Sequence, residues 1–146
     1  MGKSRGIESR QLESIKSGMA EFYTPQSSNE TMLVQIAANT VDDLFVHRFQ
    51  TDQLLVVRGS FVLVTLEDRQ YRYTLMSDRF PMVVTIPRGV LHGAINLTNE
   101  PCLLVNAVLR HAPTHERDYR PIKRPFPYNL EKVTALMKQL DQPVTV

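Results

Sequence analysis

Two histidines lie in short apolar segments of this sequence, where an imidazole is available for chemistry. His47 lies in LFVHRF and His92 lies in VLHGAINL. An imidazole exchanges a proton near neutral pH, forms hydrogen bonds through both nitrogens and binds metal ions. We therefore predict a catalytic pair in which His47 is the general base. His92 would be a second acid or base, or a group that orients the substrate.

Other residues near the histidines are candidates for contacts with a substrate. Gln53 follows His47 by six residues and has an amide that can donate and accept hydrogen bonds. Phe49 would make a pocket more apolar, as is usual in sites for small molecules. Asn106 lies in a third apolar segment, CLLVNAVL, and is a further candidate for substrate binding.

The same region offers an alternative, which is a metal site. His47, Asp52 and His92 would form a set of two imidazoles and one carboxylate, a set typical of non-haem iron and also found at zinc. This alternative requires Asp52, and not Gln53, to face the site. We predict a site that works without a metal cofactor, and a divalent ion such as Fe or Zn remains the alternative.

Short apolar segments between residues 31 and 110 would position these side chains. They are rich in β-branched residues, they have no helical period, and turn signals such as RGS and TNEP separate them. Eight such segments in about 80 residues indicate an all-β sandwich or a closed barrel. The segments are TMLVQIAA, LFVHRF, QLLVVR, FVLVTLE, QYRYTLM, MVVTIP, VLHGAINL and CLLVNAVL.

The flanking segments differ from this region. Residues 7–19 predict a short N-terminal helix, because their apolar residues recur at roughly helical spacing. Residues 111–128 are basic and contain four prolines, which predicts an extended arm. This arm would be a solubilising or dimer-contact strap, or would fold over the barrel mouth and hold an anion.

Residues 129–140 predict a C-terminal helix with Asn129 as its N-cap. The 146 residues would form one domain, with the barrel at about 31–110.

One segment matches the signature of a known family. Residues 87–96, PRGVLHGAIN, have the spacing P-x-G-x-x-H-x-x-x-N, which resembles the second signature of the cupin superfamily. The first cupin signature, H-x-H followed by a glutamate and a glycine, is matched in part. His47 stands at its first histidine, and Phe49 replaces the second. Gln53 keeps the spacing of the glutamate from His47, whereas Asp52 keeps its spacing to the glycine.

This resemblance implies an all-β fold, the cupin double-stranded β-helix or jelly-roll barrel, here with short N- and C-terminal helices. QLLVVRGSFVLVTLEDR and IPRGVLHGAINLTNEP are similar to segments of the metal-free, RmlC-like branch, the dTDP-4-dehydrorhamnose 3,5-epimerases. Those enzymes use a histidine in a segment like that of His47 as base, and a tyrosine on the strand after the second signature as acid. The matching strand here, CLLVNAVLRH, has no tyrosine, and the lysine of the family is also absent. The resemblance also implies a homodimer, and covering an open sheet edge is a physical reason for one.

Composition narrows the range of functions. The formal net charge of +2 and the lack of interleaved aromatic and basic residues argue against nucleic acid as a partner. No apolar run is long enough to span a membrane, no signal core is present, and Cys102 is the single cysteine, so we expect a cytoplasmic protein. Three functions stay open. They are an enzyme that moves a proton on a small polar, sugar-like or anionic molecule, a non-catalytic ligand-binding or sensory cupin, and a metal-dependent cupin.

Overall fold

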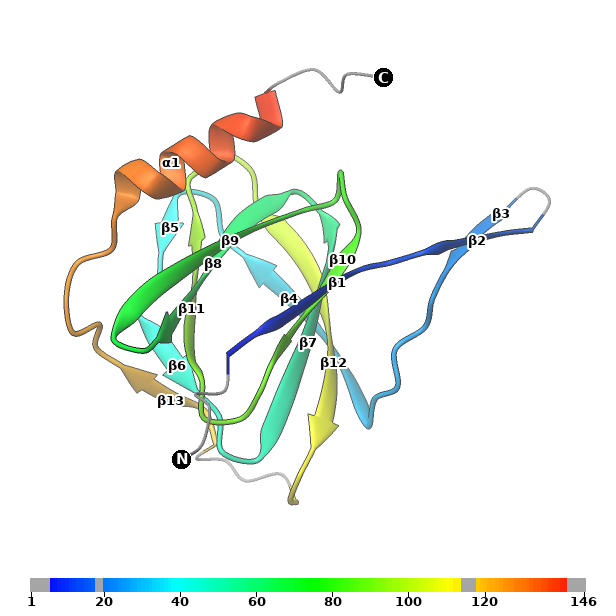
Figure 1. Cartoon of the computed structure of the whole chain (residues 1–146), viewed down its shortest axis with the longest axis horizontal. Helices are drawn as coiled ribbons and strands as arrows, with labels where there is room; N and C mark the ends of the chain where they lie inside the picture. The colour runs from blue at the N-terminus through cyan, green and yellow to red at the C-terminus, as the bar shows by residue number, and fades with distance from the viewer. Residues whose placement is uncertain (1–5, 18–19, 114–117, 142–146) are drawn as a thin grey trace.

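The chain folds into two antiparallel sheets that face each other and close into a barrel (Figure 1). The structure is a computed structural model that describes residues 6–17, 20–113 and 118–141. The predicted all-β jelly-roll class is confirmed, with one exception at the N-terminus that is described below.

The first sheet has the strand order β1-β10-β7-β12-β4, and each neighbouring pair is antiparallel. Strands far apart in the sequence therefore lie side by side, which is the arrangement of a jelly roll. In this order, the strands span Glu8–Gln11, Met82–Ile86, Gln50–Arg58, Cys102–Arg110 and Glu30–Ile36.

The second sheet has the order β13-β6-β11-β8-β9, and the two-residue strand β5 also pairs with β11. Consecutive hairpin strands β8 and β9 pair along their whole length. The strands span Arg120–Ile122, Leu44–Val46, Leu91–Asn96, Ser60–Glu67 and Gln70–Ser77, and β5 spans Thr40–Val41.

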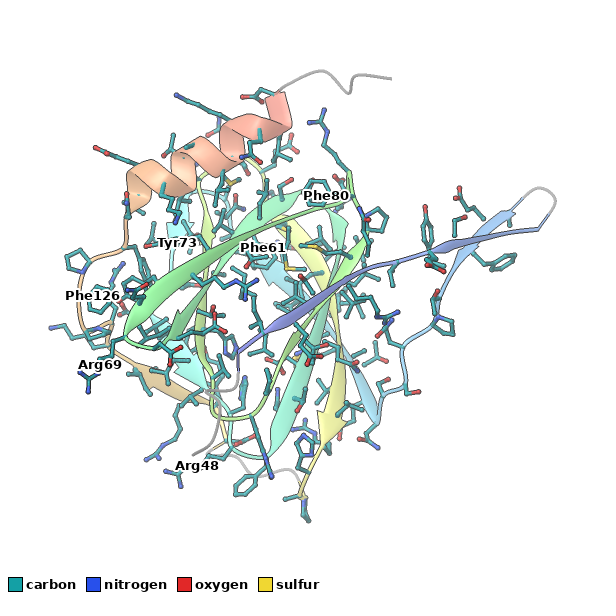
Figure 2. All side chains as sticks on the ribbon, in the orientation of Figure 1. Arg48, Phe61, Arg69, Tyr73, Phe80 and Phe126 are labelled. Carbon is teal, nitrogen blue, oxygen red and sulfur yellow. The ribbon has the colours of Figure 1, made fainter. Side chains whose placement is uncertain are left out.

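Apolar side chains at alternate strand positions fill much of the space between the two sheets. Leu54 and Val56 on β7 are buried against Phe61 and Leu63 on β8, as the period of two along a strand requires. Phe61 lies inside the barrel in Figure 2, whereas Arg48 projects from its rim. This apolar core holds the sheets together and leaves one end of the interior for polar residues.

The outer face of the second sheet is covered by the C-terminal helix α1, Leu130–Lys138, which a short 3-10 helix at Gln139–Asp141 extends (Figure 1). Val133 of the helix is fully buried against this sheet. The Asn129 side chain accepts a hydrogen bond from the Lys132 amide at 3.1 Å, so the predicted N-cap is confirmed. In the described part of the chain, no helix is long and apolar enough to cross a bilayer.

The turn after β7 needs glycine. Gly59 has a φ of +91°, and a Cβ at this position would lie 3.0 Å from the carbonyl oxygen of Pro101. Any side chain at this position would be strained by the backbone conformation and would lie tightly against Pro101.

The N-terminal segment corrects one prediction. Residues 7–17 do not form the predicted helix, whose last two residues, 18 and 19, lie outside the described part of the chain: β1 pairs with the edge of β10, and β2, Ser14–Ser17, pairs with β3, Ala20–Tyr23. This pair of strands projects away from the barrel in Figure 1. The edge of β10 offers unpaired backbone groups, and Ile7 is only 7% exposed, so sheet pairing and burial outweigh a weak helical pattern.

The arm also differs from its prediction, because part of it is a strand. Residues 120–122 form β13, which pairs with β6 at the edge of the second sheet. Pro121 is tolerated there because an edge strand needs its amide hydrogens on one side only. The arm thereby returns to the barrel, where Asp118 and Tyr119 line the cavity at its mouth.

Candidate functional site

A cavity of about 620 Å³ opens at one end of the barrel interior. Residues from both sheets line it, together with two residues of the arm. The polar residues among them are Gln35, Thr40, Asp42, His47, Gln50, Asp52, His92, Asn106, Arg110, Asp118 and Tyr119.

The two histidines meet in this cavity because their strands are neighbours. His92 on β11 pairs in register with Phe45 on β6, and His47 follows the end of β6. The ring centroids of His47 and His92 are 5.5 Å apart. Gly93 lets β11 run close to the segment before β6, because a Cβ there would lie 2.7 Å from the carbonyl oxygen of Asp43.

Asp52, and not Gln53, faces the histidines. Alternate residues Gln50, Asp52 and Leu54 of β7 line the cavity, so Gln53 points to the other side of the sheet. One carboxylate oxygen of Asp52, Oδ2, lies 3.4 Å from Nε2 of His92 and 3.6 Å from Nε2 of His47. The ambiguity that the sequence left at this position is therefore resolved.

A chain of hydrogen bonds holds the Asp52 carboxylate through Oδ1, the oxygen that does not face the histidines. Gln50 Nε2 donates to Asp52 Oδ1 at 2.6 Å, and Arg110 Nη1 donates to Gln50 Oε1 at 2.7 Å. Arg110 Nη2 donates to Glu30 Oε2 at 2.8 Å. This chain fixes the orientation of the carboxylate, so that Oδ2 is the oxygen presented to the histidines.

The environment of Asp52 keeps it ionised. Burial by itself would raise its pKa, but hydrogen bonding to His92 and the charges of His92 and His47 outweigh this effect. The amide of Asn106 adds to the stabilisation of the carboxylate, and the pKa of Asp52 is lowered to about 2. The site thus holds a buried negative charge that stabilises positive charge beside it.

The outer ring nitrogens of both histidines are fixed by the backbone. Nδ1 of His47 lies 3.2 Å from the carbonyl oxygen of Asp118, and Nδ1 of His92 lies 3.0 Å from that of Val90. A carbonyl oxygen only accepts hydrogen bonds, so the neutral rings have their proton on Nδ1. Nε2 therefore faces Asp52 with an N–H when the ring is protonated and with a lone pair when it is neutral.

Three further residues were predicted to contact a substrate, and the structure places one of them in the cavity wall and two outside it. Asn106 lines it, and its Oδ1 accepts a hydrogen bond from the Gln53 amide at 3.0 Å. The Gln53 side chain instead donates to the carbonyl oxygens of Ser27 and Ala107, outside the cavity. Phe49 is 37% exposed and does not line the cavity, because it lies on a turn at the rim.

Two residues of the arm, Asp118 and Tyr119, line the site although no pattern in the sequence predicted them there. The Asp118 carboxylate accepts hydrogen bonds from the amides of Arg48 and Phe49, at 2.7 and 3.2 Å, and anchors the arm beside His47. Tyr119 stacks on Phe45 with ring centroids 4.7 Å apart, and its ring lies 6.1 Å from that of His47. Burial and the charge of Asp42 raise the pKa of Tyr119, so its hydroxyl stays protonated.

The donor set also fits a metal ion in part. His47, Asp52 and His92 offer ligand atoms that all lie within 4.8 Å of one another. The superfamily's usual set of three histidines and a glutamate is incomplete here, because Phe49 and the strand CLLVNAVLR supply no histidine. Three protein ligands with an open position are nevertheless sufficient for zinc or iron.

The chain has the fold of the RmlC-like cupin barrels, which several sugar-nucleotide epimerases and isomerases share. A dTDP sugar isomerase from Desulfovibrio desulfuricans is similar with a TM-score of 0.68 and 16% identity, over 85% of this chain and 91% of that one. NovW, a 4-keto-6-deoxy sugar epimerase from Streptomyces spheroides, has a TM-score of 0.65 and 12% identity over 83% and 74%. The TDP-quinovose 3,4-ketoisomerase WlaRB from Campylobacter jejuni has a TM-score of 0.64 and 12% identity over 81% and 94%.

Comparison of sequences adds nothing to this likeness. No family model matches the chain, and no curated protein matches it. The likeness therefore lies in the fold.

Proposed function

We propose that this protein is an epimerase or isomerase that moves a proton on a nucleotide-linked sugar with a carbonyl group. The observation that supports this most directly is the position of His47, which lines the cavity with Nδ1 held by a backbone carbonyl and Nε2 beside the Asp52 carboxylate. The similar solved structures are named as enzymes of dTDP-linked sugars, which adds the substrate class.

In this proposal His47 removes a proton from a carbon next to the sugar carbonyl. The ionised carboxylate of Asp52 lies beside both rings and stabilises the imidazolium that forms on His47. His92, beside the same carboxylate, is the third member of this group. Tyr119 returns a proton to the sugar from the arm. This tyrosine takes the role for which the strand CLLVNAVLRH has no residue.

The test follows proton exchange rather than a single product. The purified protein is mixed with a dTDP-linked 4-keto-6-deoxy sugar in D2O, and proton NMR measures deuterium uptake beside the carbonyl. We expect uptake with the wild type, a loss of about 100-fold or more in His47→Asn, and a smaller loss in Tyr119→Phe. His111→Gln, on the exposed rim, is the control that retains the rate. No uptake with the wild type, or full uptake with His47→Asn, contradicts the proposal.

A ligand-binding protein without turnover is the second candidate. It is supported by the contact of both Nε2 atoms with Asp52, which directs them toward a carboxylate instead of toward open space. Calorimetric binding of the same sugar nucleotide without deuterium uptake would favour this function over the enzyme.

We also propose that the protein is a cytoplasmic homodimer. Support for the dimer comes from β4, which ends the first sheet in the described part of the chain and exposes Leu33 by 67%. Met32 of the same strand lines the cavity while 42% exposed, so a second copy over β4 would complete the cavity wall. Light scattering should give twice the chain mass for the wild type and a monomer for Leu33→Asp. Fractionation of the source cells tests the location.

A further inference from the structure

Arg110 is the only arginine or lysine that lines the cavity in the described part of the chain. In a protein that takes a sugar nucleotide, a guanidinium in this place would be a natural partner for phosphate oxygens. Its contacts are different here. Nη1 donates to Gln50 Oε1 at 2.7 Å, Nη2 donates to Glu30 Oε2 at 2.8 Å, and Nε is buried away from solvent. The guanidinium is therefore engaged with protein groups.

The register of the first sheet places both partners on the same face as Arg110. On β7, Gln50 lies directly opposite Arg110 of β12, and on β4 Glu30 lies opposite Val108, two residues away. Side chains opposite each other, or diagonal by two positions, are within reach of a long side chain. The backbone amide of Arg110 also donates to Asn29 Oδ1 at 2.8 Å. Three neighbouring strands thus hold the guanidinium in one position.

The guanidinium determines which way the Gln50 amide points. A guanidinium has donors only, so it must face the amide oxygen, Oε1. The amide nitrogen then points the other way, and Nε2 donates to Oδ1 of Asp52 at 2.6 Å. Gln50 and Asp52 are two residues apart on β7, so their side chains share the face toward the cavity. With the amide reversed, two oxygens would face each other and repel, and the carboxylate would turn.

The direction of this amide matters to the base. Asp52 Oδ2 lies 3.6 Å from Nε2 of His47, where its negative charge stabilises the imidazolium that forms when the ring takes a proton. A carboxylate that turns about its bond to Cβ moves Oδ2 away from the ring. Oδ2 therefore stays in place only while Oδ1 is held by a donor.

We propose that Arg110 is a positioning residue for the base and does not bind the phosphate groups of the substrate. It fixes the direction of the Gln50 amide, which holds the Asp52 carboxylate beside His47. Glu30 is the outer anchor of this chain, because it holds the second Nη of Arg110. The effect on rate rests on the proposed function, whereas the arrangement of the side chains does not.

The first experiment separates positioning from substrate binding. Initial rates of deuterium uptake are measured against the concentration of the dTDP-linked 4-keto-6-deoxy sugar. Arg110→Met should lower kcat about tenfold or more and leave KM within about twofold, because a displaced carboxylate weakens the base and not the bound substrate. Arg110→Lys, which keeps a charged donor, should recover part of the loss.

Arg72→Met is the matched control for these kinetics. Arg72 forms an exposed ion pair with Glu67, at 4.0 Å, on β9 and β8, so both constants should stay as in the wild type. A rise in KM at unchanged kcat in Arg110→Met would mean that Arg110 binds phosphate, and it would overturn the proposal. Unchanged constants in Arg110→Met would overturn it as well.

A double variant tests whether Arg110 acts through Gln50. Gln50→Leu should lower kcat by itself, and adding Arg110→Met to it should lower kcat little further. Two losses that multiply would mean that Arg110 acts on the base by another route, which contradicts the proposal.

A second measurement needs no substrate, so it decides the positioning role even if the enzyme proposal fails. Proton–nitrogen-15 NMR follows the side-chain amide of Gln50, whose signals are those missing from the spectrum of Gln50→Leu. In the wild type, the hydrogen bond to a carboxylate should shift one amide proton downfield of those of the exposed Gln70. Arg110→Met should abolish this shift.

A change at Glu30 covers the case in which Arg110→Met fails to fold. Glu30 is exposed, so Glu30→Ala leaves the core intact and only loosens Arg110. The downfield shift of the Gln50 amide should become smaller in this variant. A Gln50 amide that keeps its wild-type signals in Arg110→Met and Glu30→Ala overturns the proposal.

Discussion

Along β7 the inward side chains change character halfway. Gln50 and Asp52 are buried and polar, whereas Leu54 and Val56 are buried and apolar. The apolar half packs against Phe61, and its side chains need complementary shape but no hydrogen-bond partner. Both Leu54 and the polar half line the cavity, but only the polar half needs partners, which Arg110, Asn106 and the histidines supply.

The difference shows which end of the barrel carries its stability and which end its chemistry. Burial of apolar surface stabilises a fold without regard to direction, whereas buried polar groups stabilise it only where each one has a partner. Because a buried polar network needs a partner for every group and an apolar core does not, the position of this network at the cavity is best explained by function. Substitutions at the two ends test this difference.

The largest effect is expected at the apolar end. Phe61 is 1% exposed, so Phe61→Ala should lower the free energy of unfolding by about 3–5 kcal/mol. Urea denaturation followed by circular dichroism measures the change. Phe22→Ala is the matched control, because Phe22 is 55% exposed on the β2–β3 hairpin and should cost much less. Equal losses in the two variants would show that the apolar end does not dominate stability.

The sequence predicted only some of the residues at the polar end of the barrel, for physical reasons. His47 and His92 were predictable as a pair, because His92 lies in a strand, His47 directly follows one, and turn signals stand near both. Asp52 and Gln53 could not be distinguished, since a slip of one residue moves every side chain of a strand to the other face. Tyr119 could not be found at all, because its place depends on pairing between β13 and β6, which are distant in the sequence.

An intermediate effect on the free energy of unfolding is expected from the charge of Asp52. Its pKa is lowered to about 2 in the folded protein, below the usual value of 3.8, so its ionised form stabilises the fold above pH 4. This stabilisation, about 2 kcal/mol, is lost as the pH falls from about 4 to about 2. Unfolding curves of the wild type and Asp52→Asn should differ at pH 5 and converge only as the pH falls through 2. Parallel curves over this range would contradict the assignment.

The smallest effect is expected from the link behind the carboxylate. Gln50→Leu removes the donor to Asp52 Oδ1 and the acceptor of Arg110 Nη1. In a dry core this would be severe, but the cavity admits water to both groups, so we expect a loss of about 1 kcal/mol. A double-mutant cycle of Gln50→Leu with Asp52→Asn, measured by urea unfolding, should give a coupling of about 0.5 kcal/mol or more. Additive losses would mean that Gln50 fills space at the polar end as Leu54 does at the apolar end, and the contrast between the two ends would then rest on Asp52 and the histidines alone.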